Sequence, residues 1–525
     1  MLASAAMAEQ GAQPGHGVAD DLSPATARLA LAAVLLVALL IRVVGLGAGL
    51  PLLLQVDEPL VIDRVEAFLG GDLNPRWFYY PSLTMYLSWA VVKVWGVFQR
   101  FEPAHMYMAG RALAAILGTL TVWVAWAMAR HLGNRRAGVL AAALVALFPI
   151  HVQLSHQAGV DAPAALFTTL ALWLLWRAEA SERTAPAVAA AAACGLAASV
   201  KYSGALAFVA LAPWLVAQLW RRRFGAWLGL AFSVAVAFTV AFVAGTPYSL
   251  VEGQRFLDDL AGQAGHAREG HLGYESSSWL YLIVNPHGSL WSDADPVSFV
   301  LVLVGLGYGA WLAWSKRSPA LVGSLLFVLV TYGFFSAWRT KFVRWLLPAL
   351  PVLLTFAGCW LSEGAARLRG RLLRCAALVA VLVVPSIRSL AVLGEYVKPD
   401  TRTLATAWVS ANVPAGSMLC LDPHTAFVDN RYWFSRTLTL PAGAAGPYRL
   451  VRNPSALEGC RWVLTSSEWK QRYERREAVT MRPVEAREGQ AFYRRLAERA
   501  QLVQRFTPEH AMSGPAIEIF DLEGR

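Results

Sequence analysis

The sequence contains few charged residues for its length. Of its 525 residues, 15% are charged and 56% are hydrophobic, and the mean hydropathy is +0.44. Soluble globular proteins carry about 25% charged residues, so this composition excludes an ordinary soluble protein of one or several domains. We therefore expect an all-α polytopic membrane protein.

Acidic residues are fewer than basic ones, which gives a net charge of +11 and a pI of about 9.6. In a soluble protein this surplus would suggest nucleic-acid binding. Here much of it lies in short clusters between apolar runs, at residues 130–136, 221–223, 316–317 and 367–374. Such clusters are typical of cytoplasmic loops in membrane proteins. We therefore expect membrane lipids as partners, and no nucleic acid.

Cysteine is scarce, and its five residues show no spacing typical of a metal site, so no metal ligands are predicted. Cys194, Cys359 and Cys375 lie in or beside apolar runs and are interpreted as small buried hydrophobes. Cys420 and Cys460 both lie in the polar C-terminal part. A disulfide between them is an open alternative if that part is extracytoplasmic.

Long apolar runs dominate the first three quarters of the chain. Residues 1–24 are polar and are expected to form a disordered cytoplasmic N-terminus. They lack the basic start and the cleavage site of a signal peptide, so the first apolar run is interpreted as a retained helix. About eleven runs are long enough to cross a membrane. They lie near residues 25–44, 114–129, 137–152, 162–176, 187–200, 205–220, 226–244, 297–314, 321–337, 345–361 and 375–393.

One further apolar run, at residues 81–98, decides the topology. If it crossed the membrane, the basic clusters at 130–136 and 221–223 would face outward, against the usual bias. We therefore expect an interfacial or re-entrant helix, which suits the Trp, Tyr and Lys residues of this run. The segments that then share the outer side are 57–58, 161, 201–202, 246–295 and 338–344.

The composition changes after the last apolar run. Residues 395–525 alternate short apolar stretches with Gly, Pro and many charges, and contain no candidate span. Strands are predicted at 417–421, 461–465 and 516–520, and a helix at 486–502. We expect a transmembrane domain of residues 25–394 followed by a small α/β extracytoplasmic domain of residues 395–525.

Two adjacent carboxylates, Asp57 and Glu58, open the first outer loop. An acid held at a membrane boundary can act as a general base toward an acceptor hydroxyl or amine. The alternative is helix capping, with Pro59 at the first helical position. Another carboxylate, Asp161, lies in a short turn on the same side. Alone it could equally be a helix cap; together with Asp57 it is a candidate to orient an acceptor or to bind a metal.

Basic residues on the outer side are candidates for binding a phosphate. Lys201, with Tyr202 beside it, follows one expected span, and Arg339, Lys341 and Arg344 lie between two later ones. Arginine offers a fork of donors to phosphate and lysine a point charge. The alternative for each is snorkelling to lipid headgroups.

The loop of residues 246–296 is the longest between the expected spans, and loops of this length are usually functional or mobile. It contributes His266 and His271 as candidates for substrate binding. Their spacing does not match a zinc motif.

Five short motifs, taken in order, resemble the GT-C glycosyltransferases. They are the acidic pair after the first span, the sequence Tyr79-Tyr80-Pro81-Ser82-Leu83, Asp161, Lys201, and the Lys-x-x-Arg-Trp-Leu-Leu-Pro sequence at 341–348. The set is similar to bacterial relatives of the dolichyl-phosphate-mannose protein mannosyltransferases and of the lipid A aminoarabinose transferases. The resemblance covers about residues 25–393.

This resemblance implies a GT-C-like fold and an inverting transfer of a sugar from a polyprenyl-phosphate carrier to a protein, lipid or glycan acceptor on the outer membrane face. It assigns Asp57 as the catalytic base with Glu58 beside it, and Asp161 as a support for the acceptor or the base. The substrate-binding candidates are Tyr80, Lys201, Tyr202, His266, His271, Arg339, Lys341 and Arg344. No cofactor is certain, and a divalent cation is left open. A Gly-rich phosphate loop is absent, as expected for a donor without a nucleotide. The Trp-Trp-Asp sequence of oligosaccharyltransferases is absent too, so the acceptor is not specified.

Two other functional classes fit part of the pattern. A transporter or lipid flippase would also have many spans and buried charges, but here the charges cluster in outer loops and no inverted repeat is found. A membrane-anchored scaffold would act through residues 395–525. We prefer the enzyme because the motifs agree in order and sidedness.

Overall fold

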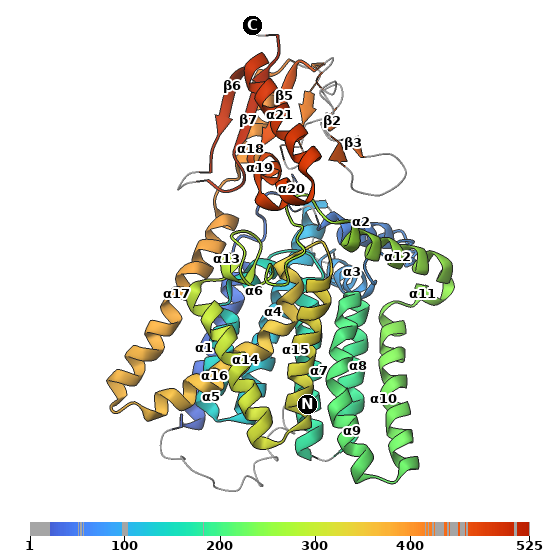
Figure 1. Cartoon of the computed structure of the whole chain (residues 1–525), viewed down its shortest axis with the longest axis vertical. Coiled ribbons are helices and arrows are strands. Elements are labelled where there is room, and N and C mark those ends of the chain that lie inside the picture. The colour runs from blue at the N-terminus through green and yellow to red at the C-terminus, as the bar shows by residue number, and fades with distance from the viewer. Residues whose placement is uncertain are drawn as a thin grey trace.

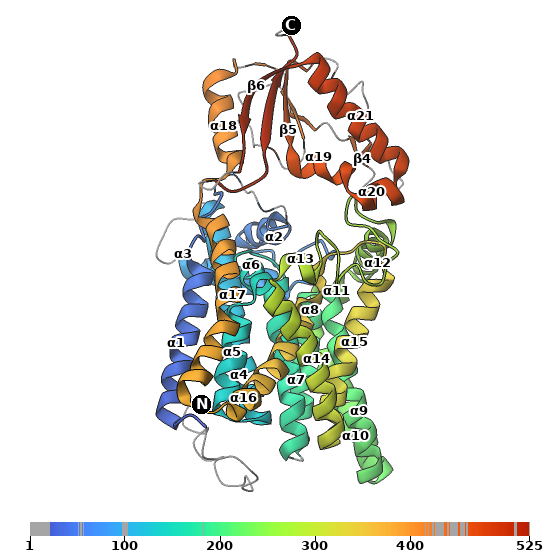
Figure 2. The ribbon, with the colours of Figure 1, turned by 60° about the vertical axis from the view of Figure 1, so that its left-hand side comes forward.

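A bundle of long helices carries a small domain of strands and helices at one end (Figures 1 and 2). This computed structural model describes residues 21–50, 52, 55, 57–96, 103–181, 183–414, 416–417, 419–422, 425, 435–437, 440–441, 450–451, 457, 460–508 and 512–523. The expected fold class, a helical membrane protein with a small α/β domain, is confirmed.

The bundle consists of α1 (Pro24–Val43), α4 (Pro103–Leu132), α5 (Arg135–Ala146), α6 (Pro149–Leu154), α7 (Asp161–Ser181), α8 (Ala185–Val200), the 3₁₀ segment η3 (Tyr202–Ala210) with α9 (Leu211–Arg221), α10 (Phe224–Gly245), α14 (Pro296–Lys316), α15 (Pro319–Ala337), the 3₁₀ segment η4 (Val343–Ala349) with α16 (Leu350–Arg367), and α17 (Arg371–Val397). Among the described residues, eight helical segments are long and apolar enough to cross a membrane. They are 24–43, 104–132, 202–221, 224–245, 296–316, 319–337, 343–367 and 371–397. The other three expected runs form α5 with α6, α7 and α8, so the number of eleven spans stays a prediction.

The run expected to span at residues 137–152 is not one continuous helix. α5 ends at Ala146, and α6 begins at Pro149 after Phe148, which has an extended backbone. Proline disfavours the helical conformation in the residue before it, and its ring cannot sit inside a helix without a break. The 12 residues of α5 extend only about 18 Å, less than the hydrocarbon thickness of about 30 Å. Most of its side chains are buried, so other helices surround it.

α1 carries a fully buried arginine near its end. The Arg42 guanidinium donates to the Ala38 carbonyl oxygen at 2.8 Å and to the Ala146 and Val145 carbonyl oxygens at 3.1 and 3.4 Å. Its Nη2 also lies 2.8 Å from Nδ1 of His151. A guanidinium inside a membrane protein needs such partners. Arg42 therefore fastens α1 to the junction between α5 and α6.

Short helices form a layer at the end of the bundle nearest the small domain (Figure 1). They are α2 (Pro59–Leu69), α3 (Leu83–Gly96), α11 (Tyr248–Val251), α12 (Gly253–Glu269) and α13 (Leu290–Asp293). The run at 81–98 contains α3, which is not among the candidate spans and packs against α2 and α4. This arrangement fits the expected interfacial helix. The long loop of residues 246–296 is therefore partly helical.

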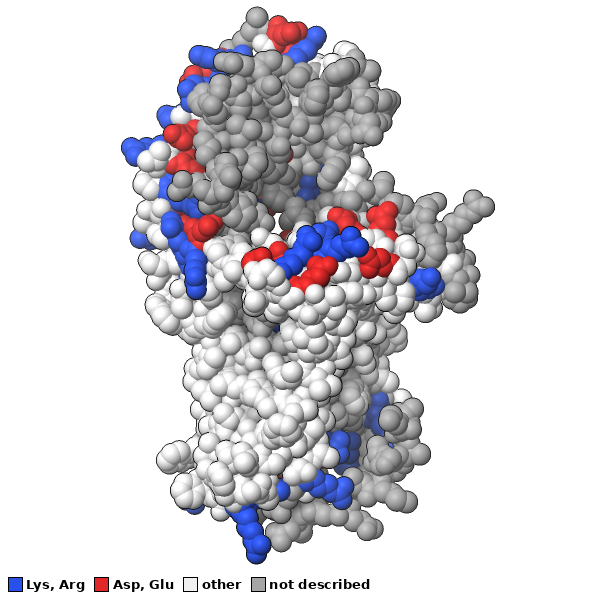
Figure 3. Space-filling view, turned by 90° about the vertical axis from the view of Figure 1, so that its right-hand side faces the viewer, with Lys and Arg blue, Asp and Glu red and all other residues white. Residues whose placement is uncertain are grey.

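Charged side chains gather at two levels of the molecule. On the face shown in Figure 3, a broad uncharged band lies between basic residues at one end and mixed charges near the small domain. The basic clusters at 130–136, 221–223, 316–317 and 367–374 all join helices at the end away from that domain (Figure 1). The segments predicted to share the outer side lie at the opposite end.

The small domain is built on a five-stranded sheet with the strand order β2-β1-β5-β7-β6. β1 pairs in parallel with β2 and β5, whereas β7 pairs antiparallel with β5 and β6. The strands are β1 (Leu419–Leu421), β2 (Ser435–Thr437), β5 (Trp462–Ser466), β6 (Gln501–Phe506) and β7 (Ile517–Asp521), with a separate short pair, β3 (Leu440–Pro441) and β4 (Leu450–Val451). The helices are α18 (Thr401–Asn412), α19 (Ser467–Glu474), α20 (Arg476–Met481) and α21 (Pro483–Arg499).

Alternation of side chains along the strands explains why helices cover both faces of this sheet. Leu419, Leu421 and Leu464 belong to a core with α18, and Cys420 and Val463 belong to a second core with α19 and α21. Figure 2 shows α18 on one side of the sheet and α19, α20 and α21 on the other.

The three predicted strands are present with slightly different limits, but the predicted helix at 486–502 is too long at its end. α21 ends at Arg499, and the next residues pair with β7 as strand β6. Tertiary pairing therefore overrides the local helix preference of Gln501 and Leu502.

The cysteines follow the predictions with one exception. Cys420 and Cys460 form a disulfide, and Cys194 and Cys359 are buried. The expectation that Cys375 is buried is wrong: it is exposed on α17, whose outer face has few protein neighbours.

Candidate active site

Asp57 lies in the turn before α2 and forms an ion pair with Arg344. Pro59 starts α2 at its first helical position, which is favourable for proline, so the turn ends directly after the acidic pair. Arg344 lies in η4, and its guanidinium also stacks over the ring of Phe342 at 5.2 Å. About a third of each paired side chain is exposed. This ion pair can therefore meet a ligand.

Asp161 and Lys201 form a second ion pair, with the Lys201 Nζ 2.6 Å from Oδ1 of Asp161. Asp161 is in the first turn of α7, where a carboxylate interacts favourably with the helix N-terminus. Lys201 caps the C-terminal end of α8, where a cation is favourable. About a tenth of each side chain is exposed. The two acids singled out from separate loops thus each have a basic partner.

Arg344 connects the two ion pairs. Its charge interacts with both Asp57 and Asp161, and also with Tyr80. Tyr80 packs edge-on against the ring of Trp77, with the ring centroids 5.8 Å apart. The structure therefore brings Asp57 and Asp161, which come from separate loops, close to Arg344 and Tyr80.

Glu58, in contrast, points away from solvent. It is 1% exposed, and Arg111 donates to both of its carboxylate oxygens at 2.8 and 2.7 Å. The backbone N–H of Ala158 donates to Oε1 at 2.9 Å. Arg111 itself also donates to the Leu46 and Ala48 carbonyl oxygens. Glu58 therefore has the contacts of a structural residue that holds the Asp57 turn in place.

The two histidines lie side by side at the edge of the site, with ring centroids 5.9 Å apart. Burial lowers the pKa of His266, which also lies in the fields of Asp57 and Arg344. Burial, reinforced by the positive charge of Arg472, lowers the pKa of His271 well below its usual range. Nε2 of His271 lies 2.9 Å from Nη1 of Arg472, and an arginine can only donate, so His271 accepts as the neutral imidazole.

Two predicted phosphate ligands are used elsewhere. Arg339 pairs with the buried Glu275 at 2.8 Å and donates to the Met481 carbonyl oxygen in the small domain at 3.2 Å. Glu275 also pairs with Arg482 of that domain. Arg339 therefore ties the bundle to the small domain.

Lys341 is fully buried, and its Nζ donates to the carbonyl oxygens of Ser336 and Phe335 at the end of α15. Burial lowers the pKa of Lys341 to about 8. Tyr202 donates its hydroxyl to the Phe78 carbonyl oxygen at 2.5 Å, which fixes the loop before α3. Both side chains therefore donate to backbone carbonyl oxygens.

Sequence reasoning missed several residues that support the site. Arg111 was detectable as a charged residue in an otherwise apolar helix, but its partner lies 53 positions away. Asp259, which accepts from the Phe78 backbone N–H at 2.7 Å, carries no local signature. Asp295 caps α14 by accepting from two backbone N–H groups.

No group of three or more His, Cys, Asp or Glu side chains that could hold a metal ion occurs in the part of the chain that the structure describes. Asp57 pairs with Arg344 and Asp161 pairs with Lys201.

Comparison with known proteins gives a family match for part of the chain. Residues 83–244 match the family model described as dolichyl-phosphate-mannose-protein mannosyltransferase. This range includes Asp161 and Lys201 and excludes Asp57 and Arg344. A search of curated proteins returned no match.

Solved structures of similar fold cover almost the whole chain. ArnT from Cupriavidus metallidurans, bound to undecaprenyl phosphate, is 16% identical with a TM-score of 0.56, and the alignment covers 95% of this chain and 98% of that one. The Archaeoglobus fulgidus oligosaccharyltransferase in the apo form is 14% identical with a TM-score of 0.55, covering 87% of this chain and 71% of that one. The same organism's AglB, in complex with an inhibitory peptide and a dolichol-phosphate, is 13% identical with a TM-score of 0.54, covering 86% and 71%. These likenesses and the family match confirm the resemblance inferred from the motifs.

Proposed function

We propose, starting from the GT-C glycosyltransferase fold of this chain, that it is a membrane enzyme transferring a sugar from a polyprenyl-phosphate carrier to an acceptor on the outer membrane face. The observation that carries the proposal is the exposed Asp57–Arg344 ion pair beside the Asp161–Lys201 pair. An acid there can accept the proton of the acceptor, and a cation there can bind the phosphate of the carrier. The undecaprenyl phosphate bound to ArnT and the dolichol-phosphate bound to AglB support the class of carrier.

In the proposed reaction, an acceptor hydroxyl or amine attacks the anomeric carbon of the donor from the face opposite the phosphate. The bond between the anomeric carbon and the phosphate oxygen breaks, and its electron pair stays on the phosphate. The acceptor proton passes to the carboxylate of Asp57. Attack from the opposite face inverts the anomeric configuration.

Arg344 has a double role in this proposal. Negative charge grows on the carrier phosphate as the bond breaks, and a fixed cation stabilises that charge most in the transition state. Without substrate, the Arg344 guanidinium is occupied by Asp57. A bound phosphate would compete for the same donors and leave the carboxylate free to accept a proton. Lys201, held by Asp161, is the second cation. Tyr80 and His266 lie close enough to interact electrostatically with Arg344.

The distribution of charge supports the outer orientation. The four basic clusters lie at the end of the bundle away from the small domain, and basic turns favour the cytoplasm. The Cys420–Cys460 disulfide in the small domain supports the same orientation, because disulfides persist in oxidising compartments.

The test is turnover of lipid-linked donors by the purified protein in nanodiscs. A panel of polyprenyl-phosphate sugars and nucleotide sugars would be incubated with wild type and Asp57→Asn, and released polyprenyl phosphate or nucleotide would be measured. We expect turnover of a lipid-linked donor only, reduced about 10²- to 10⁴-fold in the variant, as is typical for loss of a general base. Asp72→Asn, which alters an exposed acid after α2, is the matched control and should keep full turnover. Turnover within twofold of wild type in Asp57→Asn would refute the assigned base.

A further inference from the structure

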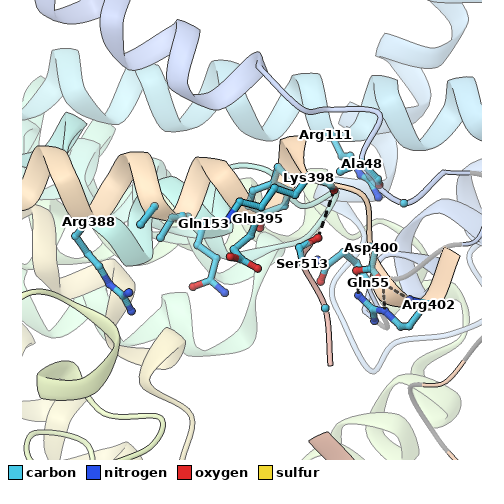
Figure 4. Close-up of a pocket in the computed structure, with 15 residues that line it drawn as sticks. Ala48, Gln55, Arg111, Gln153, Arg388, Glu395, Lys398, Asp400, Arg402 and Ser513 are labelled. Atoms are coloured by element: carbon cyan, nitrogen blue, oxygen red, sulfur yellow. Dashed lines mark hydrogen bonds and ion pairs between the residues drawn. The ribbon is translucent and has the colours of Figure 1, made fainter. Parts of the chain in front are cut away.

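Two cavities outside the proposed active site meet at one arginine of α17. The first, of about 460 Å³, lies between the end of α17, the segment before α2 and the start of the small domain (Figure 4). The second, of about 610 Å³, lies between α17 and the α13–α14 junction. Arg388 and Ala391 line both. The two cavities therefore form one groove, called here the α17 groove.

The two halves of the α17 groove differ in chemistry. The first half is lined mostly by polar side chains, among them the cations Arg111, Arg388, Lys398 and Arg402 and the carboxylates Glu395 and Asp400. The second half contains mainly apolar ones, including Trp291, Val384 and Ile387. Half of Trp291 and more than half of Ile387 remain exposed. The apolar half is bounded by α14 and α17, both candidate membrane spans, so it adjoins the lipid.

Arg388 and Lys398 are cations of the groove that lack a close acidic partner in the described part of the chain. Within the described residues, neither side chain makes a hydrogen bond or an ion pair, although the field of Arg388 reaches the Asp293 carboxylate. Arg111 and Arg402, in contrast, are paired with Glu58 and Asp400. Figure 4 shows Arg388 standing apart from the paired residues.

The depth of Arg388 makes its lack of a partner informative. It lies nine residues before the end of α17 at Val397, which corresponds to roughly 14 Å along the helix. Arg388 also lines a cavity with Asp295 and Pro296, where α14 begins, so it lies toward the outer end of the membrane spans. A guanidinium on a lipid-facing helix is costly unless it meets water or an anion, and such residues mark functional sites. Basic pockets between membrane helices bind anionic lipid headgroups.

We propose that the α17 groove binds one membrane lipid with a phosphate-bearing headgroup. The chains lie in the apolar half between α14 and α17, and the phosphate lies on Arg388. Lys398, ten residues further along, adds positive charge in the polar half. Glu395 makes no hydrogen bond or ion pair among the described residues and can accept from a headgroup hydroxyl, as can the Gln153 side chain. The lipid is an anionic glycerol- or sugar-headed phospholipid, and its site differs from that of the sugar donor.

This site adjoins the loop of the proposed base. Gln55 lies two residues before Asp57, and Arg111 lines the groove while holding Glu58. A lipid in the groove therefore places its headgroup beside the segment that carries Asp57. The binding itself does not depend on the proposed sugar transfer.

Phosphatidylglycerol is the probe, because it combines a phosphate with two hydroxyls. Its retention by the full-length protein would be measured by native mass spectrometry as it is titrated against phosphatidylcholine. We expect the double variant Arg388→Gln, Lys398→Gln to bind phosphatidylglycerol roughly 30-fold more weakly, because it loses two basic residues that attract the anionic headgroup. Ala391→Trp blocks the junction of the two halves without changing charge, and it should weaken phosphatidylglycerol binding as well. This variant tests the groove independently if the double variant does not fold. Arg371→Gln, at the other end of the same helix, should not.

Three results would overturn the proposal. Equal loss in Arg371→Gln would mean general attraction of anionic lipid to a basic protein. Unchanged binding in both groove variants would mean that no lipid occupies the groove. Loss in Arg344→Gln with retention in the groove variants would place the phosphate at the proposed donor site. Because Asp57→Asn should keep full phosphatidylglycerol binding, failure of the proposed reaction and failure of the lipid site give different results.

Discussion

Removal of either partner of the buried Glu58–Arg111 pair should destabilise the protein more than it alters the chemistry. The side chains are 1% and 3% exposed, so Glu58→Gln leaves a largely buried guanidinium without its counter-charge. Breaking a buried pair on one side costs about 3–5 kcal/mol. Folded domains are stable by only about 5–15 kcal/mol, so the loss is a large fraction of the total. We expect Arg111→Leu to cost a similar amount.

The comparison of single and double variants separates the pair from its surroundings. Glu58→Leu with Arg111→Leu removes both charges together, so the double variant should be no less stable than either single one. It still leaves the Ala158 N–H and two carbonyl oxygens without partners, at about 1–3 kcal/mol for each group that stays dry. The double variant should therefore remain below wild type.

The assay is reversible unfolding in mixed micelles, followed by tryptophan fluorescence, with turnover measured under conditions where each variant is folded. The exposed Asp72–Arg76 pair is the matched control, and Arg76→Gln should leave the stability close to that of wild type. If Glu58→Gln retained wild-type stability but lost turnover as fully as Asp57→Asn, Glu58 would take part in the chemistry, and the inference from burial would be wrong.

Two further predictions concern buried polar groups at the edge of the site. Lys341→Met should lower the free energy of unfolding by about 1–3 kcal/mol, because carbonyl oxygens at the end of α15 lose their donor, while KM for the lipid-linked donor stays the same. His271→Gln should flatten the loss of thermal stability on acidification. The folded-state pKa of His271 is lowered, so below about pH 6.5 the unfolded chain binds more protons than the native one, and stability falls as the pH falls.

Each of these predictions has an outcome that contradicts it. A large rise in donor KM with unchanged stability in Lys341→Met would show that its Nζ reaches a phosphate. For the histidine, the exposed His287→Gln is the control and should leave the pH profile of the melting temperature as it is. A His271→Gln profile identical to wild type would mean that this imidazole does not titrate across the unfolding transition.

The fold was largely predictable because membrane spans and strands follow short-range patterns. Apolar runs located the long helices, and the short apolar stretch at 417–421 located a strand, which the structure shows to be covered on both faces. The failures come from residues whose effect is steric or tertiary. Pro149 divides an apolar run that composition alone presents as continuous, and Gln501 enters a strand because β7 lies beside it.

The candidate site was predictable in its composition but not in its pairings. Sidedness brought Asp57, Asp161, Lys201 and Arg344 to one end of the bundle, and the structure shows which acid faces which base. Position in sequence could not tell that Glu58 turns inward while its neighbour stays exposed. That difference depends on Arg111, which only the packing of α4 against α2 brings within reach.

The buried contacts of Arg42 have a consequence for how the chain is made. Its partners at Val145, Ala146 and His151 are synthesised 103 to 109 residues later. At about 5–20 residues per second, the ribosome needs roughly 5–20 seconds to deliver them. During that interval the Ala38 carbonyl oxygen is the contact that α1 itself offers to the Arg42 guanidinium. Arg42 lies close enough to the end of α1 for its side chain to reach the lipid headgroups. We therefore expect the bundle to close around α1 only after α5 and α6 have left the translocon.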